Sequence, residues 1–386
     1  MKIAVITSGL LPVPAQKGGA VENLIDYYIS YNERVGSHEF DVYTVQPQVL
    51  VPDGKYVRYK NVNTSSFLYR LKRRFYAKFH KGDYYDAYLM FFLRTIIPSV
   101  IGGLYDLILL ENRPGYALEL SKVTSVPLYL HLHTDTMYKN GNILDEDVCK
   151  KVTKIITVSN YIKNRVLSIG EKVNVNTVLN GIDCSRFVES ASVHRNLFGL
   201  NADDFVVVYF GRIDEIKGVR ELLLSIRKLH DIDKIKLLII GSNTFSSINT
   251  EDSYSLELKK IAADLKDKVY FTGFVPYDRI PSYLKSCDVS VLPSLCDDAC
   301  PLSVIEAMAC GLPVVSTNAG GIPELCEGAG ILVDRDDDLV DNIAFVIRRL
   351  FLDKEYYRLV SRNCYEQSKR FDKDLFSASF LKELGD

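Results

Sequence analysis

The sequence predicts an α/β protein with two Rossmann-like domains, each built on a parallel sheet, and with helices at the carboxyl end. Its 386 residues are too many for one hydrophobic core and fit two domains of ordinary size. Short runs rich in β-branched residues alternate with helical patterns, which favours parallel strands joined by right-handed crossovers. Many of these runs are continuously apolar, as expected for strands that are covered on both faces.

The expected strands form two groups. In the first half they are 2–7, 40–45, 105–110, 127–132, 154–159 and 176–180. In the second half they are 204–210, 235–241, 268–274, 288–293, 313–317 and 330–334. We place the domains at 1–183 and 184–365. A terminal helix at 366–386 could pack back on the first domain, although the sequence alone does not choose its partner. Two such sheets facing each other would form a cleft lined by ligand-binding loops.

Composition narrows the range of functions. Apolar residues make up 47% and charged residues 25% of the chain, and the net charge is -2. This balance is typical of a globular protein and gives no reason to expect a nucleic-acid partner. Among the eight cysteines, Cys296, Cys300 and Cys310 cluster without metal-ligand spacing, so we expect reduced thiols and no metal site.

The amino terminus does not resemble a signal peptide. Its apolar run at 2–7 lacks a small-residue cleavage site and is better explained as a buried strand. Arg94 and Pro98 interrupt the most apolar longer segment, so no membrane span is expected. We therefore expect a cytoplasmic protein.

The loop after the first expected strand contains a glycine pair. Gly18 and Gly19 precede a helix that should begin near Val21, where free backbone N–H groups could bind an anion. The loop is not G-x-G-x-x-G, so the fingerprint of a dinucleotide-binding domain is absent. A flexible turn remains an equal alternative.

The corresponding loop of the second domain reads "GRIDEIKG" (211–218). Arg212 and Lys217 place two cations beside a helix that Gly218 should open, a combination suited to a diphosphate. A solvated loop is the alternative, because arginine and lysine are frequent in exposed loops.

The segment "PLSVIEAMAC" (301–310) predicts a helix with Pro301 at its first position. The first turn would form a second anion-binding element from the N–H groups of Leu302 and Ser303. Glu306 lies about one turn further along and could accept two hydrogen bonds from a diol such as a ribose. A solvated helix face fits poorly, because the neighbours of Glu306 are apolar.

His131 and His133 lie at the end of the strand expected at 127–132. A histidine on a strand is usually structural. His133 lies past the strand end, where the chain could turn into the cleft, and is the better functional candidate.

Together these motifs resemble the retaining GT-B glycosyltransferases of family 4. The characteristic pattern of that family, E-x7-E followed by an apolar helix and two glycine motifs, appears here as Asp298, Glu306, "GLPVVST" (311–317) and "GGIPE" (320–324). Further matches span almost the whole chain in the order of the family. They are "KGGAVE" (17–22), "HTD" (133–135), "ITVS" (156–159), "NGID" (180–183) and "GRIDEIKG" (211–218).

The resemblance implies roles for the residues of the second domain. Arg212 and Lys217 would neutralise the diphosphate of a sugar nucleotide as it leaves. The amides of Leu302 and Ser303 would contact phosphate, and Glu306 would hold the ribose.

It also implies that Gly19 approaches the diphosphate, that Asp298 holds hydroxyls of the donor sugar, and that His133 lies beside the anomeric centre. Phe274 falls where the family holds the base. Two departures concern the donor sugar: Asp298 replaces the usual glutamate, and Pro301 stands where glycine is usual.

The implied reaction transfers a sugar from a UDP- or GDP-sugar to a hydroxyl of a glycan or lipid-linked glycan, with retention at the anomeric carbon. It fits the synthesis of bacterial surface polysaccharide or glycoconjugates. No Asp-x-Asp pair stands at a strand end in the expected nucleotide site, so we expect no metal and no cofactor. We favour departure and attack on the same face over a covalent intermediate. A sugar-nucleotide 2-epimerase and a non-catalytic sugar-nucleotide-binding protein are the alternatives.

The segment 69–82 mixes six lysines and arginines with phenylalanine and tyrosine, in the domain expected to bind the acceptor. Such a segment could lie on an anionic membrane surface and make the protein peripheral on the inner face of the plasma membrane. An anionic polymer or a mobile loop would fit it equally well.

Overall fold

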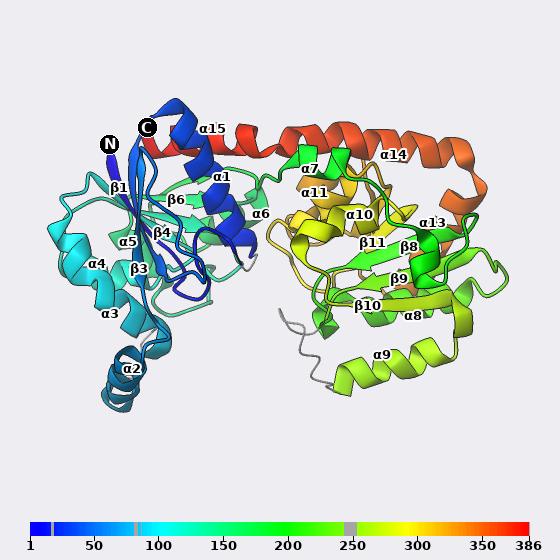
Figure 1. Cartoon of the computed structure of the whole chain (residues 1–386), viewed down its shortest axis with the longest axis horizontal. Helices are drawn as coiled ribbons and strands as arrows, with labels where there is room; N and C mark the ends of the chain where they lie inside the picture. The colour runs from blue at the N-terminus through cyan, green and yellow to red at the C-terminus, as the bar shows by residue number, and fades with distance from the viewer. Residues whose placement is uncertain (17–18, 81–83, 86, 243–252, 386) are drawn as a thin grey trace. The chain divides into compact units, whose positions relative to one another are not determined.

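The computed structural model describes residues 1–16, 19–80, 84–85, 87–242 and 253–385 (Figure 1). The chain divides into two compact units: Met1–Gly181 with Lys373–Asp386, and Ile182–Asp372. Each unit contains one parallel sheet with helices between its strands. The predicted class, α/β with two Rossmann-like domains, is therefore confirmed.

In the described part of the first unit the sheet has seven strands in the order β3-β2-β1-β4-β5-β6-β7. They are β1 (Lys2–Ile6), β2 (Glu39–Val45), β3 (Val57–Val62), β4 (Leu107–Glu111), β5 (Leu128–Leu132), β6 (Lys154–Thr157) and β7 (Asn174–Thr177). The helices are α1 (Ala20–Val35), α2 (Phe67–Phe79), α3 (Ala87–Gly102), α4 (Tyr116–Leu120), α5 (Asp145–Lys151), α6 (Asn160–Leu167) and α15 (Lys373–Gly385). The strand order reverses between β1 and β4, so the loops after these two strands diverge at the carboxyl edge.

In the described part of the second unit the sheet has six strands in the order β10-β9-β8-β11-β12-β13. They are β8 (Phe205–Phe210), β9 (Ile235–Ile240), β10 (Val269–Gly273), β11 (Val289–Leu292), β12 (Val314–Thr317) and β13 (Ile331–Val333). The α-helices are α7 (Cys184–Glu189), α8 (Val219–Lys228), α9 (Ser253–Ala263), α10 (Ile280–Leu284), α11 (Leu302–Ala309), α12 (Ile322–Cys326), α13 (Leu339–Leu352) and α14 (Lys354–Ser368). Here the order reverses between β8 and β11. By the rule for open parallel sheets, a ligand is expected beside the loops that follow these two strands.

Short 3-10 segments complete the described elements. They are η1 (Arg195–Phe198), η2 (Glu215–Lys217), η3 (Lys266–Lys268), η4 (Tyr277–Arg279) and η5 (Lys369–Phe371). Several α-helices begin at a side-chain cap. Ser66, Ser159 and Asp353 accept hydrogen bonds from the N–H groups at the starts of α2, α6 and α14. These caps satisfy donors that have no partner within the helix.

β3 was not predicted from the sequence, and its omission from the expected strands was wrong. This strand pairs in parallel with β2, from Phe40 opposite Val57 to Val45 opposite Val62. It lies at the sheet edge and only Val57 is buried, so its sequence "VRYKNV" lacks the apolar run by which the other strands were found.

The carboxyl-terminal helix α15 packs on α1 within the first unit. The rings of Tyr28 and Phe380 stack with centroids 4.7 Å apart, and Arg34 pairs with Asp374 at 2.5 Å. We expected one helix over 366–386. Instead α14 and η5 keep 366–372 in the second unit, and the chain enters the first unit at Lys373.

None of the described helices combines the length and the continuous apolar composition that crossing a bilayer requires.

Candidate functional site

A cavity of about 230 Å³ lies in the second unit where the strand order reverses. It is bounded by the loop after β8, the loop after β11 and the first turn of α11. Its lining residues are Tyr209, Phe210, Gly211, Arg212, Lys217, Leu292, Ser294, Asp298, Pro301, Leu302, Ser303, Val304, Ser316 and Ile322. Five predicted site residues are therefore brought together: Arg212, Lys217, Asp298, Leu302 and Ser303.

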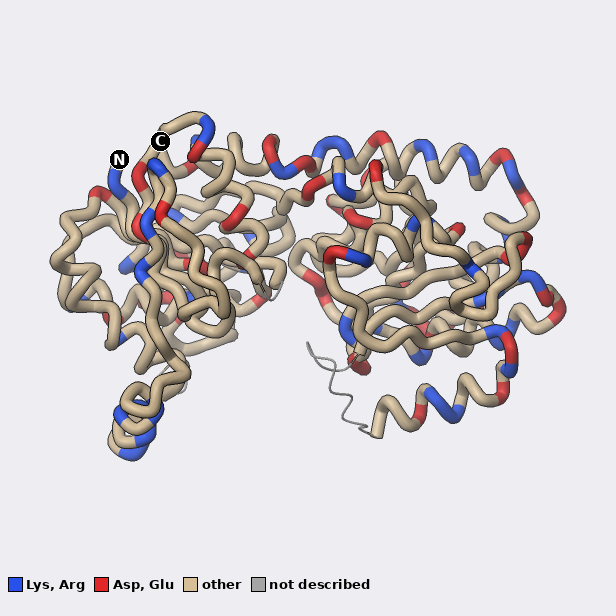
Figure 2. The backbone as a smooth tube through the Cα atoms, viewed as in Figure 1, with Lys and Arg blue, Asp and Glu red and all other residues tan. Residues whose placement is uncertain are grey.

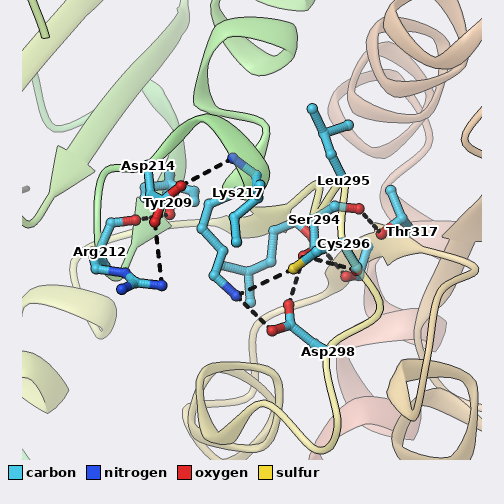
Figure 3. A network of polar contacts seen from close by, with 12 residues as sticks. Tyr209, Arg212, Asp214, Lys217, Ser294, Leu295, Cys296, Asp298 and Thr317 are labelled. Atoms are coloured by element: carbon cyan, nitrogen blue, oxygen red, sulfur yellow. Dashed lines mark hydrogen bonds and ion pairs between the residues drawn. The ribbon is translucent and has the colours of Figure 1, made fainter. Parts of the chain in front are cut away.

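The loop after β8 is shaped by its own polar contacts. The Tyr209 hydroxyl donates to the carbonyl oxygen of Arg212 at 2.6 Å, and Arg212 pairs with Asp214 at 3.2 Å (Figure 3). Gly218 ends the loop with a φ of 71°, in the left-handed region that favours glycine. A Cβ at this position would also overlap the carbonyl oxygen of Pro293. The loop can therefore lie directly on the end of β11 only because residue 218 is glycine.

Lys217 reaches the loop after β11. Its Nζ lies 2.5 Å from Oδ1 of Asp298, while Oδ2 of Asp298 accepts a hydrogen bond from the Ser294 hydroxyl at 2.6 Å (Figure 3). The sulfur of Cys296 lies 3.9 Å from the same Nζ. The two loops are thus joined by an ion pair that is about one-fifth exposed on each side. An entering anion would compete with Asp298 for Lys217.

The first turn of α11 adds backbone donors to the cavity. Pro301 occupies the cap position, with φ -71° and ψ 119°, and the helix begins at Leu302. The expected placement of Pro301 at the first helical position was therefore one residue off. The first amides of a helix have no acceptor inside it, so those of Leu302 and Ser303 can serve an anion in the cavity.

Glu306 is buried within α11, with 5% of its surface exposed, and is not among the cavity-lining residues. The hydroxyl of Tyr277 donates to its Oε1 at 2.8 Å. Burial raises the pKa of Glu306 to about 7, and the Tyr277 hydrogen bond and the charge of Arg186 only partly oppose this. Its carboxyl group is therefore half ionised near neutral pH.

Two other predicted residues, Phe274 and Gly19, are not among the residues that line this cavity. Phe274 follows β10 and is 43% exposed. Gly18 lies outside the described residues. Gly19 precedes α1 in the first unit with a φ of 112°, and a Cβ there would overlap the carboxylate of Glu22.

His133 lies in the first unit, just after β5. Its backbone N–H donates to the side chain of Asn112, and its Nε2 lies 2.9 Å from Oε2 of Glu111. Glu111 closes β4, is fully buried and is not among the site residues predicted from the sequence. Its position at the end of an expected strand was the only available signal.

Other contributors were also missed. Gly321 donates its N–H to the carbonyl oxygen of Asp298 at 2.7 Å, so the "GGIPE" turn supports the loop after β11. Asp214, Ser294 and Tyr277 hold Arg212, Asp298 and Glu306. Tyr277 and Glu306 are 29 residues apart and meet only in the folded unit, whereas the other two pairs are close in sequence but match no recognised pattern.

The architecture recurs in solved structures. The Anabaena protein Alr3699/HepE, solved in complex with UDP and glucose, superposes with a TM-score of 0.74 over 100% of this chain and 99% of its own, at 22% identity. Two parallel-sheet Rossmann-like units in one chain define the GT-B fold, which is the architecture that this chain has.

Similarities in sequence point to glycosyltransferases. Residues 192–367, most of the second unit, match the family described as Glycosyl transferases group 1. YtcC of Bacillus subtilis (strain 168), a candidate glycosyltransferase, is 25% identical over 94% of this chain and 86% of its own. The lipopolysaccharide 1,2-N-acetylglucosaminetransferase of Salmonella typhimurium (strain LT2) is 24% identical over 47% of this chain and 46% of its own. This chain is therefore similar to the group 1 glycosyltransferases, and the family match lies within its second unit.

Proposed function

We propose that this chain is a retaining, metal-independent glycosyltransferase of family 4. It would transfer a sugar from a UDP- or GDP-sugar to a hydroxyl of a glycan or lipid-linked glycan. The observation that carries the proposal is one cavity that combines Arg212 and Lys217 with the first-turn amides of Leu302 and Ser303. Such donors offset the negative charge that develops on a departing diphosphate, which a metal ion does in other enzymes.

The similar proteins support the donor and the pathway. HepE binds UDP and glucose, which favours a UDP-sugar as donor. The Salmonella relative adds a sugar to lipopolysaccharide, which supports a role in the synthesis of bacterial surface polysaccharide.

In this proposal Asp298 exchanges its contact with Lys217 for hydroxyls of the donor sugar, while Lys217 turns to the diphosphate. Glu306 holds the ribose. The roles that the family resemblance implies for Gly19, His133 and Phe274 stay predictions.

The function is tested by screening nucleotide sugars for thermal stabilisation and then incubating each stabilising donor with candidate acceptors, with and without EDTA. Retention is read from the anomeric coupling constant of the product by NMR. A product of inverted configuration, or activity that EDTA abolishes, would contradict the proposal. With donor alone, a 2-epimerase would form an epimeric sugar nucleotide, and a non-catalytic binding protein would leave the donor unchanged even when acceptor is present.

Donor binding should depend on the ionisation of Glu306. An ionised carboxylate accepts both hydroxyl protons of a ribose, and a pKa of about 7 leaves Glu306 mostly protonated at pH 6. Affinity for UDP should therefore rise up to about tenfold from pH 6 to pH 8, the ratio of the ionised fractions for such a pKa. Calorimetric titration at both pH values measures this rise, and Glu306→Gln should remove it. An equal pH dependence in the variant would assign the effect to another group.

The same raised pKa should make the folded protein less stable as pH rises, although it makes donor binding stronger. Glu306 has a pKa above its ordinary value of 4.5, so the unfolded chain binds fewer protons than the folded chain between about pH 4.5 and 7. The contribution of Glu306 to the free energy of unfolding therefore falls as pH rises through this window.

We also propose that α2 attaches the protein to the inner face of the plasma membrane. Tyr69 and Tyr76 of α2 pack on Phe91 of α3, which anchors one side of the helix. The remaining surface carries five exposed apolar side chains, each at least 53% accessible: Phe67, Leu68, Leu71, Phe75 and Phe79. The helix also carries five cations and no acidic residue, and Figure 2 shows them gathered along it. Residues 81–82 of the basic aromatic segment lie outside the described residues.

Replacing Lys72, Arg74 and Lys78 by glutamine should weaken binding to anionic vesicles about 100-fold, since each basic residue near such a surface contributes about 1 kcal/mol. Co-sedimentation with phosphatidylglycerol vesicles measures the change. The matched control replaces three exposed cations of the second unit, Lys228, Arg348 and Lys369, and should bind as the unaltered protein does. Equal losses in both variants, or no binding by the unaltered protein, would exclude α2 as a membrane-binding helix.

A further inference from the structure

Glu111 is a buried carboxylate with three donors around it. The Tyr28 hydroxyl donates to Oε1 at 3.0 Å, while His131 Nδ1 and His133 Nε2 lie 3.0 and 2.9 Å from Oε2. Glu111 and His131 stand opposite each other in the register of β4 and β5, and Tyr28 comes from α1. The carboxylate is therefore fixed by two strands and a helix, and its position does not depend on solvent.

The protonation of this group follows from its contacts. Burial alone would raise the pKa of Glu111, but the two histidines outweigh burial and lower that pKa to about 2. An ionised carboxylate can only accept hydrogen bonds. The ring nitrogens that face it, Nδ1 of His131 and Nε2 of His133, must therefore both carry hydrogen.

His133 is neutral in this environment. Burial and the neighbouring His131 lower its pKa to about 4, against the opposing charges of Glu111 and Glu22. A neutral imidazole with hydrogen on Nε2 has its lone pair on Nδ1. No hydrogen bond among the described residues reaches this Nδ1. Nε2 of His131 is buried and has no hydrogen-bond partner in the described part of the chain. Nδ1 of His133 does not belong to this group of buried, unpartnered atoms. Solvent can therefore reach Nδ1 of His133.

We infer that Glu111 is a positioning residue that fixes His133 in one tautomer, with hydrogen on Nε2, so that Nδ1 accepts a hydrogen bond from a hydroxyl of the substrate. The inference rests on the proposed function only where it takes that substrate to be a sugar. An acceptor nitrogen beside the carboxylates of Glu111 and Glu22 suits a hydroxyl and disfavours an anionic group such as a uronate. His133 then recognises the sugar and does not act as a general acid.

The same three residues could also suit a metal ion, since their ligand atoms lie within 4.8 Å of one another. The two nitrogen-to-oxygen distances, however, are those of N–H donors bound to a carboxylate. A proton on each ring nitrogen explains the geometry without a cation.

The tautomer can be observed directly in the full-length protein labelled with ¹⁵N-histidine. The chain has six histidines, and His133→Gln assigns the resonances of His133. Long-range ¹H–¹⁵N spectra should show a neutral ring with hydrogen on Nε2 from pH 8 to pH 5. A ring with hydrogen on Nδ1, or an imidazolium at pH 7, would overturn the inference. So would one equivalent of zinc that copurifies with the protein and whose removal shifts the His131 and His133 resonances. Because this readout needs no turnover, it can succeed even if the proposed reaction is wrong.

Glu111→Gln then tests the positioning role. A glutamine can present either its oxygen or its NH₂ group to His133, so both tautomers should appear in the spectrum. Turnover should fall about tenfold, the loss of roughly one hydrogen bond to the substrate. The matched control is Glu119→Gln on α4, whose carboxylate pairs with the exposed Lys122, and it should change neither readout. A single Nε2–H tautomer with full turnover in Glu111→Gln would refute the role. If this variant does not fold, the spectrum of the unaltered protein decides alone.

Discussion

Replacing Lys217 by alanine should lower kcat about 100- to 1000-fold, the usual cost of removing one donor that stabilises charge developing in a transition state. Lys217 lines the cavity beside Arg212 and the first turn of α11, and its ammonium group lies 2.5 Å from Asp298 in the free protein. The variant would lose the cation that can move from this carboxylate to a departing diphosphate. Steady-state kinetics with the donor found by screening measures the loss.

Two controls make this experiment specific. Lys228→Ala removes a lysine of α8 that pairs with Asp341 at the surface, and it should keep full activity. Lys217→Ala also leaves Asp298 without its cation, so the repulsion of the donor by Asp298 has to be separated from the loss of Lys217. Lys217→Ala combined with Asp298→Asn removes that charge and should stay as slow as the single variant. Full recovery in the double variant would show that Lys217 only neutralises Asp298.

Replacing Gly218 by alanine should destabilise the second unit by about 3 kcal/mol, more than the 1–2 kcal/mol of a left-handed residue alone. The additional cost arises because a Cβ would overlap the carbonyl oxygen of Pro293 and push the loop after β8 away from β11. For a unit of this size the melting temperature should fall by about 6–12 °C. Differential scanning calorimetry provides the measurement.

Gly328→Ala is the matched control. Gly328 has a φ of 70°, almost identical to that of Gly218, but an added Cβ would meet no atom within 4 Å. It should therefore show the backbone cost without the overlap. Equal melting temperatures for the two variants would mean that the close approach of the two loops contributes nothing.

The sequence predicts the fold well where strands are central. β1, β4 and β8 are almost wholly buried, so their apolar runs report directly on their position. β3 was missed because it is an edge strand that pairs with β2 alone and, with charged residues at alternate positions, has little to bury. The local composition of a strand indicates whether it is buried. Whether it pairs with another strand depends on a neighbour that is distant in sequence.

The same distinction applies to the cavity. Arg212 and Lys217 lie in a loop and Leu302 begins a helix, and the glycines and proline that mark these segments are visible in the sequence. The partner of Lys217 could not be deduced, because Asp298 also fits a purely substrate-binding role. Glu111 was missed for a related reason: a single acidic residue after an apolar strand is common, and its two histidines come from the next strand.

The packing of α15 on α1 affects the order in which the two units can complete their folding during translation. Phe376, Phe380, Leu381 and Leu384 belong to the same apolar cluster as Leu24, Ile25 and Tyr28. Each buried side chain of this kind contributes roughly 2 kcal/mol. The first 181 residues therefore leave the ribosome with an uncovered apolar groove, which stays open until the whole second unit has been translated. Exposed apolar surface of this kind favours non-native contacts, so we expect the first unit to complete its folding only after α15 has been translated, while the second unit can fold as soon as its own last residue emerges.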